Sequence, residues 1–423
     1  MTDSVEWDWE TGEKFVADIN EWSAVYNWVE EPYASPDGEK IAAIVNVGEG
    51  EFNVCLNGSI WERAANFEKA WYLRFSPDGR LTALVSDDMV WTIAVDGRTW
   101  ENSFDYVWNT IFSKNGDRIA VSSQQEGQYC MVLDDTPWEK TFRQMTGMVI
   151  SSDGEKTAAA VPTVDLGEGE IFKFQEGIFT AAANGKSWEK NFVNVWNMAF
   201  SPDGSQLAAE VRLNLYDYTI AVNGVPWDKT FGCVWEPVFH PFKGTVLAPV
   251  KAAGSWTMAE DGTIIWPSGF VQVWHQIVSP DGSKLAAIVA PSFGKWTVAV
   301  DGKPWNISFG DLVTDAVFSP DSSKIAAVAK ENDSYSIVVN ETAWDDQFDM
   351  AWKPVFSPDS QYVAAKVEKS GKYTIAVNGK CWSRICDMAW DPVFSPDGAS
   401  ILCRSIENGK YYRRVIPIDE MQQ

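Results

Sequence analysis

Short apolar stretches separated by polar turns run along the whole chain, and residues 352–382 show the pattern clearly. The stretches WKPVF, YVAAKV and YTIAV are separated by a Ser-Pro-Asp turn at Ser357 and followed by an Asn-Gly turn at Asn378. They are rich in β-branched residues and alanine and show no helical period, so we expect strands. With a fourth strand opened by Trp382, the unit has four strands, which we label a to d in chain order.

The turn between strands a and b recurs about every 39 residues along the sequence. The ten copies, most of them Ser-Pro-Asp-Gly or a close variant, begin at Ser35, Ser76, Ser113, Ser151, Ser201, His240, Ser279, Ser319, Ser357 and Ser395. Because repetition indicates a folding device, we interpret the turn aspartates as structural rather than catalytic or metal-binding. Four-stranded units of this length predict an all-β chain folded as a β-propeller of about ten blades.

Tryptophan follows the same period. The chain has 23 tryptophans, and most occupy three recurring positions: after the Asn-Gly or Asp-Gly turn, five residues before the turn serine, and at the start of strand c. A buried tryptophan removes on the order of 200 Å² from water, so the simplest interpretation of these positions is packing between strands. A functional tryptophan surface is the alternative.

Both ends of the chain favour a closed ring in a single domain, residues 1–423. Residues 14–28 resemble strands c and d without a preceding a and b, while the last unit supplies strands at 393–395, 401–406 and 411–417 and then stops. An N-terminal closing segment, residues 1–30, would complete the last blade and remove its exposed edge. Two five-bladed rings are the alternative, but they need two closures and the sequence shows one.

One repeat carries extra residues between strands b and c, residues 162–177. This insertion falls on the rim opposite the Ser-Pro-Asp-Gly turns, and an insertion confined to one rim often marks a binding face. The alternation of Phe172 and Phe174 about Lys173 suits an edge strand or a docking finger. We therefore predict a partner-docking site at Glu168, Glu170, Phe172 and Phe174, with an idle hairpin as the alternative.

Charge and the N-terminal sequence limit the partners and the location. The net charge is −25, and such a field repels nucleic-acid phosphates and anionic membrane surfaces. The N-terminus lacks the basic and apolar regions of a signal peptide, and no apolar run is long enough to span a membrane. We expect a cytoplasmic protein without nucleic-acid partners or a membrane span, whose six cysteines are reduced.

Cofactor and catalytic motifs are missing from the sequence. It contains no Cys-x-x-Cys, phosphate-binding loop or Gly-x-Ser-x-Gly motif, and its two histidines, His240 and His275, are expected to be blade residues. The closest cysteine pair, Cys381 and Cys386, has no recognised metal spacing. We predict no cofactor, no metal site and no enzymatic activity.

The repeat FSPDGxxIAAxV followed by YTIAVNG resembles the TolB/WD40-like propeller repeat over nearly the whole chain. That resemblance implies a fold but no chemistry. The acidity, the tryptophan-rich repeats and the lack of cofactor motifs together resemble the tryptophan-rich subunit of the transmembrane electron-transfer (Tmc) complex of sulfate-reducing bacteria.

This second resemblance implies a non-catalytic cytoplasmic subunit that docks on and stabilises a membrane-bound electron-transfer complex. Its partners would be the cytochrome b membrane subunit and the iron–sulfur subunit, which would hold it at the inner membrane during sulfate respiration. A soluble interaction propeller with an unrelated partner is the first alternative. The second is a quinoprotein-like enzyme, because AVDGKPW and AVNGKCW are similar to the quinoprotein tryptophan repeat. Those enzymes, however, are exported and carry a dedicated cofactor pocket.

Overall fold

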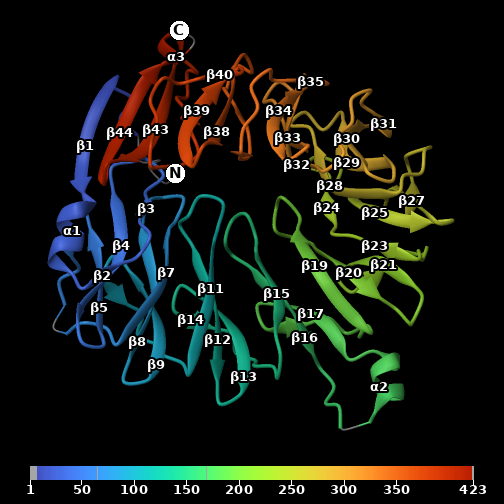
Figure 1. The fold of residues 1–423 in the computed structure, drawn as a ribbon. Helices are drawn as coiled ribbons and strands as arrows, with labels where there is room; N and C mark the ends of the chain where they lie inside the picture. The colour runs from blue at the N-terminus through green and yellow to red at the C-terminus, as the bar shows by residue number, and fades with distance from the viewer. Residues whose placement is uncertain (1–6, 64, 168, 422–423) are drawn as a thin grey trace. The chain divides into compact units, whose positions relative to one another are not determined.

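The computed structural model describes residues 7–63, 65–167 and 169–421. The fold is all-β, with ten antiparallel sheets that follow one another along the chain (Figure 1). Each sheet is one blade with strands a to d, so the predicted ten-bladed β-propeller is confirmed. Two compact units contain the blades: residues 1–42, 55–59 and 266–423 form unit 1, and residues 43–54 and 60–265 form unit 2.

Blades 2 to 6 belong to unit 2, and each runs in the order a, b, c, d. Their strands are β7 (Lys69–Phe75), β8 (Leu81–Asp87), β9 (Val90–Val95) and β10 (Arg98–Thr99) in blade 2; β11 (Tyr106–Phe112), β12 (Ile119–Gln125), β13 (Gln128–Leu133) and β14 (Thr136–Pro137) in blade 3; β15 (Thr146–Ile150), β16 (Thr157–Pro162), β17 (Phe179–Ala183) and β18 (Lys186–Ser187) in blade 4; β19 (Asn194–Phe200), β20 (Leu207–Arg212), β21 (Tyr218–Val222) and β22 (Val225–Pro226) in blade 5; and β23 (Cys233–Val234), β24 (Val238–Phe239), β25 (Val246–Ala252), β26 (Ser255–Glu260) and β27 (Thr263–Ile264) in blade 6.

Blades 7 to 10 belong to unit 1. Their strands are β28 (Gln272–Val278), β29 (Leu285–Ser292), β30 (Lys295–Val300) and β31 (Lys303–Pro304) in blade 7; β32 (Leu312–Phe318), β33 (Ile325–Glu331), β34 (Ser334–Val339) and β35 (Thr342–Ala343) in blade 8; β36 (Met350–Ala351), β37 (Val355–Phe356), β38 (Val363–Lys369), β39 (Lys372–Val377) and β40 (Lys380–Cys381) in blade 9; and β41 (Met388–Ala389), β42 (Val393–Phe394), β43 (Ser400–Glu407), β44 (Lys410–Pro417) and β1 (Gly12–Asp18) in blade 10.

Blade 1 and three short helices complete the fold. Blade 1 consists of β2 (Trp28–Val29), β3 (Tyr33–Ala34), β4 (Ile41–Gly48), β5 (Glu51–Leu56) and β6 (Ser59–Ile60). The helices are α1 (Ile19–Val25), α2 (Ile171–Glu176) and α3 (Ile418–Met421). None of the helices in the described part of the chain has the length and apolar character needed to cross a bilayer.

Strand a is interrupted in every blade, by one of two devices. In four blades strand a is split into two short strands, and a proline stands directly before the second of them. Proline interrupts the strand because it lacks the N–H that the ladder needs. These prolines are Pro32, Pro237, Pro354 and Pro392. In the other six blades a residue with positive φ forms a bulge instead. These residues are Tyr72, Asn109, Gly147, Asn197, His275 and Asp315.

The core of each blade lies along strand b, where small and β-branched side chains are almost fully buried. In β29, for example, Ala286, Ala287 and Ile288 have no exposed surface. The tryptophan after strand d adds to this core: Trp138 is 8% exposed and donates a 2.8 Å hydrogen bond from Nε1 to Thr157 Oγ1 in the next blade. This burial fits the packing interpretation of the recurring tryptophans.

The turns between strands a and b are held by the aspartates that the sequence singled out. In blade 5 Ser201 Oγ donates to Asp203 Oδ1 at 2.5 Å, and the backbone N–H of Ser205 donates to the same oxygen at 3.0 Å. Neighbouring turns are joined by a lysine, since Lys284 Nζ donates to the carbonyl oxygen of Ser322 at 2.8 Å. Lys156 and Lys324 repeat this bond to the carbonyl oxygens of Gly204 and Ser360.

These turn bonds predict a specific weakness to acid. The serine hydroxyl and the backbone N–H lower the pKa of Asp203 to about 2, and the same causes lower the pKa of Asp153, Asp281, Asp321, Asp359 and Asp397. A carboxylate with a lowered pKa contributes stability above its unfolded pKa of 3.8 and loses it as the pH falls. We therefore expect the urea midpoint to fall steadily from pH 4 to pH 2. Asp203→Asn should flatten that slope, whereas Asp228→Asn, in a loop of the same blade, should leave it unchanged; equal slopes in the two variants would contradict the assignment.

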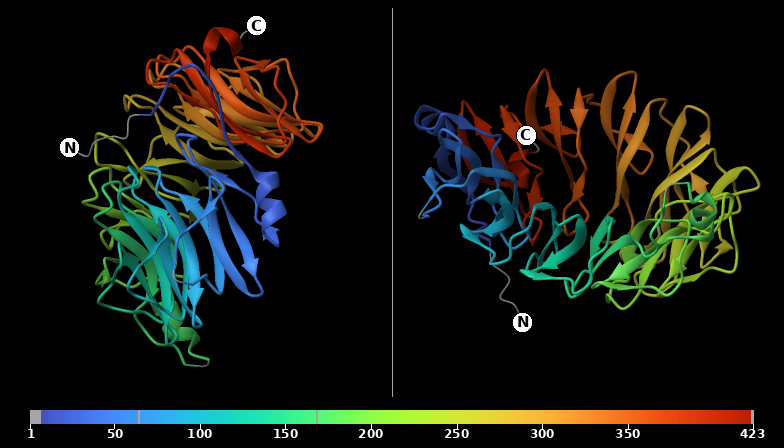
Figure 2. Two further views of the ribbon diagram at one scale, coloured as in Figure 1. Left: turned by 90° about the vertical axis from the view of Figure 1, so that its left-hand side faces the viewer. Right: turned by 90° about the horizontal axis from the view of Figure 1, so that it is seen from below.

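The N-terminal strand completes the last blade, as the chain ends predicted. β1 pairs antiparallel with β44, from Gly12 opposite Val415 to Asp18 opposite Lys410. Figures 1 and 2 show β1, in blue, alongside the red strands of the C-terminus. The predicted strands at 393–395, 401–406 and 411–417 correspond to β42, β43 and β44.

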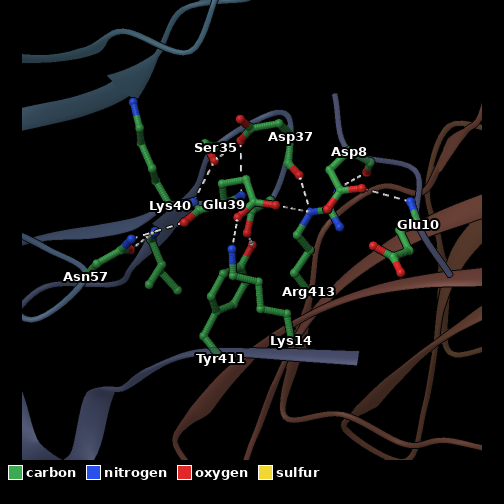
Figure 3. Close-up of polar contacts among 12 residues, drawn as sticks. Asp8, Glu10, Lys14, Ser35, Asp37, Glu39, Lys40, Asn57, Tyr411 and Arg413 are labelled. Atoms are coloured by element: carbon green, nitrogen blue, oxygen red, sulfur yellow. Dashed lines mark hydrogen bonds and ion pairs between the residues drawn. The ribbon is translucent and has the colours of Figure 1, made fainter. Parts of the chain in front are cut away.

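The junction of blades 10 and 1 uses the buried Arg404, Arg413 and Tyr411 in place of the single lysine. Figure 3 shows Arg413 and Tyr411 beside the turn of blade 1 at Ser35 and Asp37. Arg404 Nη1 donates to the carbonyl oxygen of Ser35 at 2.8 Å, and Tyr411 Oη donates to that of Gly38 at 3.0 Å. Arg413 Nε donates to the carbonyl oxygen of Asp37 at 2.8 Å. Gly38 has a φ of +77°, and a Cβ there would lie 3.1 Å from the side chains of both arginines, so the turn needs glycine.

Two local predictions were wrong. Residues 14–28 contain only one strand, β1, followed by helix α1 and the start of blade 1, because the Asp18 side chain accepts from the Asn20 N–H and caps a helix. Trp382 follows strand d instead of opening it: β40 ends at Cys381, and the Trp382 N–H bonds to the carbonyl oxygen of Ile375 at 2.8 Å.

Candidate docking surface on the b–c hairpins

The predicted insertion connects strands b and c of blade 4, and it folds as helix α2 at the end of β16 and β17 (Figure 1). The edge-strand prediction for Phe172 and Phe174 is therefore wrong. A turn that begins at Gly167 brings the chain into a helix, because the N–H of Gly167 donates to Glu170 Oε2 at 2.6 Å. Lys173 Nζ then closes the loop on the carbonyl oxygen of Asp165 at 2.6 Å.

The predicted docking residues differ in their exposure and contacts. Phe172 is 81% exposed, whereas Phe174 is half-buried. Glu170 is engaged within the loop, where the Gly167 N–H and Lys173 lower the pKa of its carboxyl. Glu168 lies outside the described residues. The docking role of this set stays a prediction, with Phe172 as the side chain most open to a partner.

Other b–c hairpins also present a large apolar side chain at the tip. Met89 in blade 2 is 85% exposed, Tyr216 in blade 5 is 79% exposed and Phe293 in blade 7 is 95% exposed. With Phe172 they form a set that we call the exposed hairpin residues. Met89 also has a φ of 64°, a left-handed backbone conformation that a bulky side chain rarely adopts. In the equivalent turns of blades 3, 6 and 10 this position is a glycine, namely Gly127, Gly254 and Gly409.

Aromatic pairs lie just below these hairpins. Within several blades an aromatic side chain on strand a contacts one near the start of strand c. The pairs, with the distance between ring centroids, are Trp71–Trp91 (5.8 Å), Trp108–Tyr129 (5.8 Å), Trp196–Tyr218 (6.4 Å), Trp235–Trp256 (5.2 Å), Trp352–Tyr373 (5.6 Å) and Trp390–Tyr411 (5.5 Å). Such contacts stabilise the hairpin ends from within each blade.

Blade 5 carries a buried acid that the sequence reasoning missed. Glu210 is 5% exposed and accepts a 2.8 Å hydrogen bond at Oε2 from Asn197 Nδ2. Burial, with a smaller contribution from the charge of Glu236 in the next blade, raises the pKa of Glu210 to about 7. The signal was available, since the segment LAAEV of blade 5 has glutamate where blade 7 has isoleucine in LAAIV.

The cysteines do not form a reactive site. All six thiols are free, and burial raises the pKa of Cys55, Cys381 and Cys386 to about 11. A protonated thiol is a weak nucleophile and a poor metal ligand. Across residues 7–63, 65–167 and 169–421, no three His, Cys, Asp or Glu side chains gather in a way that could hold a metal ion.

Comparisons with known proteins add a distant structural likeness. No protein-family model matches this sequence, and the search of curated proteins found no relative. A solved structure described as "Crystal structure of the eukaryotic initiation factor" is 12% identical, with a TM-score of 0.47 over 82% of this chain and 92% of its own.

A β-propeller of this kind fits a role in protein interaction. Loops at the ends of blades often carry binding residues, and here three b–c hairpins of unit 2 and one of unit 1 end in exposed apolar side chains. The repeat pattern could have located these tips in the sequence, because Met89 and Phe293 interrupt otherwise polar turns. Their exposure depends on the hairpin geometry, which the pattern does not supply.

Proposed function

We propose that this chain is a non-catalytic docking protein that binds a partner protein through its b–c hairpins. The observation that carries the proposal is the set of exposed hairpin residues, Met89, Phe172, Tyr216 and Phe293. Leaving such side chains in water is unfavourable by roughly 25 cal/mol per Å² of apolar surface, and a partner that covers them recovers that free energy. Hot spots of protein interfaces are similarly rich in large, well-packed side chains.

The partner that we propose is a membrane-bound electron-transfer complex with cytochrome and iron–sulfur subunits, which the chain would stabilise from the cytoplasmic side. The resemblance of the acidic, tryptophan-rich repeat to the tryptophan-rich Tmc subunit supports this identity. The acidic surface supports a partner with a basic docking face, since complementary charge steers association.

A tagged pull-down from detergent-solubilised native membranes tests both parts of the proposal. We expect haem and iron–sulfur subunits to be recovered with the tagged chain in a stable ratio. Recovery of a different, stoichiometric partner would contradict the electron-transfer assignment while keeping the docking function. Recovery of the chain alone, from the soluble fraction, would contradict both.

Substitution of a hairpin residue localises the interface. Phe172→Ser should reduce partner recovery by about tenfold or more, the effect expected when a large interface side chain worth more than about 1.4 kcal/mol is removed. Phe242→Ser is the matched control, because Phe242 is 70% exposed but lies in the turn between strands a and b of blade 6. Equal losses in the two variants would place the partner elsewhere.

A further inference from the structure

Blade 7 contains an apolar groove at the foot of its b–c hairpin. The groove has a volume of about 510 Å³ and is lined chiefly by Trp274, Trp296, Phe293, Val271, Gln272 and Gly310. This volume falls within the range of sites that bind small molecules or single peptide side chains. Trp274 and Trp296 occupy the positions of strands a and c where other blades have a contacting aromatic pair.

A β-bulge explains why the groove occurs in this blade. Val289 pairs with Thr297 and Ser292 with Lys295, so the two residues Ala290 and Pro291 stand opposite the single residue Trp296. A bulge bends its strand and redirects the facing side chain. In blade 6, where the ladder is regular, the equivalent Trp235 and Trp256 stack with their centroids 5.2 Å apart and their planes at 5°.

A carboxylate of the neighbouring blade, Glu331, lies against Gly310 at the edge of the groove. The N–H of Gly310, which lines the groove, donates to Glu331 Oε2. The two Glu331 oxygens lie 3.4 and 3.5 Å from the position that a Cβ on Gly310 would take. Lys295 precedes Trp296 in strand c, so the alternation of side chains along a strand places it on the opposite face.

Aromatic faces beside a carboxylate favour one kind of occupant. A guanidinium is planar and weakly hydrated, so it stacks on tryptophan faces and donates to a carboxylate at the same time. The net charge of −25 attracts a basic segment to the protein as a whole. The groove combines these features with an apolar side chain that can cover an occupant, the 95% exposed Phe293 at the hairpin tip.

We propose that the blade 7 groove binds an arginine side chain from a basic, extended segment of a partner protein. The guanidinium lies between Trp274 and Trp296 and donates to Glu331, and Phe293 closes over its aliphatic stem. This inference rests on the proposed docking function and names the chemistry that one of its hairpins recognises.

Titration of a synthetic peptide tests the groove directly. The probe is a short fluorescein-labelled peptide of alternating arginine and alanine, compared by anisotropy at low salt with the same peptide carrying neutral citrulline in place of arginine. We expect the arginine peptide to bind at least about tenfold more tightly, because citrulline keeps the shape but loses the charge that cation–π and ion-pair contacts need. Equal binding of the two peptides would overturn the proposal.

Two variants distinguish peptide binding in the groove from binding to the acidic surface elsewhere on the protein. Glu331→Gln keeps an acceptor for the Gly310 N–H, just as Gln125 Oε1 accepts from the Asp105 N–H in blade 3, and removes only the charge. This variant should weaken binding of the arginine peptide by about fivefold and reduce the salt dependence of that binding. Phe293→Ser should weaken peptide binding by a similar factor, whereas Tyr216→Ser, the matched variant in another b–c hairpin, should leave peptide binding unchanged.

The outcomes distinguish this inference from the proposed function. Arginine-selective binding that survives both Glu331→Gln and Phe293→Ser in folded protein would place the peptide on other acidic surface and overturn the groove assignment. That result would leave the pull-down unaffected. A failed pull-down beside groove-dependent peptide binding would instead contradict the electron-transfer partner and retain the groove.

Discussion

Replacing Arg413 by methionine should lower the free energy of unfolding by about 3 kcal/mol, because removing one partner of a buried ion pair is strongly destabilising. The Arg413 side chain is 4% exposed and its Nε lies 2.9 Å from Glu39 Oε1. The same nitrogen donates to the carbonyl oxygen of Asp37, and Nη2 donates to that of Asp8. Methionine fills the volume of the aliphatic stem but removes the donor to both carbonyl oxygens and leaves Glu39 paired with Lys14 alone.

Arg384→Met is the matched control for urea unfolding at pH 7. Arg384 also pairs with a glutamate in blade 10, at 3.1 Å from Glu13 Oε2, but its side chain is 49% exposed. Exposed pairs contribute about 0–1 kcal/mol, so this variant should change stability little. If both variants lose the same stability, the junction of blades 10 and 1 does not depend on the buried arginine.

Replacing Glu210 by glutamine should stabilise the protein by about 2–3 kcal/mol at pH 8 and by much less at pH 5. The pKa of Glu210 is raised to about 7 from 4.5, and every tenfold change in proton affinity corresponds to about 1.4 kcal/mol. Between pH 4.5 and 7 the folded state keeps a proton that the unfolded state releases, so stability falls as the pH rises through this window. Above pH 7 the buried charge is fully formed, and glutamine avoids it while still accepting from Asn197.

Urea midpoints of the wild type and the variant across this pH range test the assignment. Glu236→Gln serves as a comparison, because it removes only the secondary cause of the raised pKa and should move the pH window slightly downward. An advantage of Glu210→Gln that is the same at pH 5 and pH 8 would show that the carboxyl is not titrating in this range.

Periodic features of the sequence predicted the blades well because they are local. The Ser-Pro-Asp-Gly turn is held by bonds within five residues, as in Ser201 and Asp203, so its chemistry is visible in the sequence. The pairing of β1 with β44 was also predictable, since the last repeat lacks a fourth strand. The number of strands and their order follow from these two features.

The sequence predictions failed in short segments whose pattern of apolar residues fits both a strand and a helix. In residues 171–176 the spacing of Phe172 and Phe174 suits a strand, but the segment forms a helix within a loop held by contacts at Gly167 and Asp165. Asp18 and Glu21 already carried a helix-start signal that the alternation around Trp22 obscured. The blade 7 groove could not be predicted from the sequence, because it depends on the pairing register of Val289 and Ser292 rather than on residue type.

The pairing of β1 with β44 also determines when the protein can finish folding. During synthesis β1 leaves the ribosome about 400 residues before its partner β44. Until then the N-terminal strand has no native neighbour, and closing so long a loop is entropically slow. A nascent chain released before β44 would therefore display an open strand edge, so premature termination, even within the last blade, yields a product prone to aggregate.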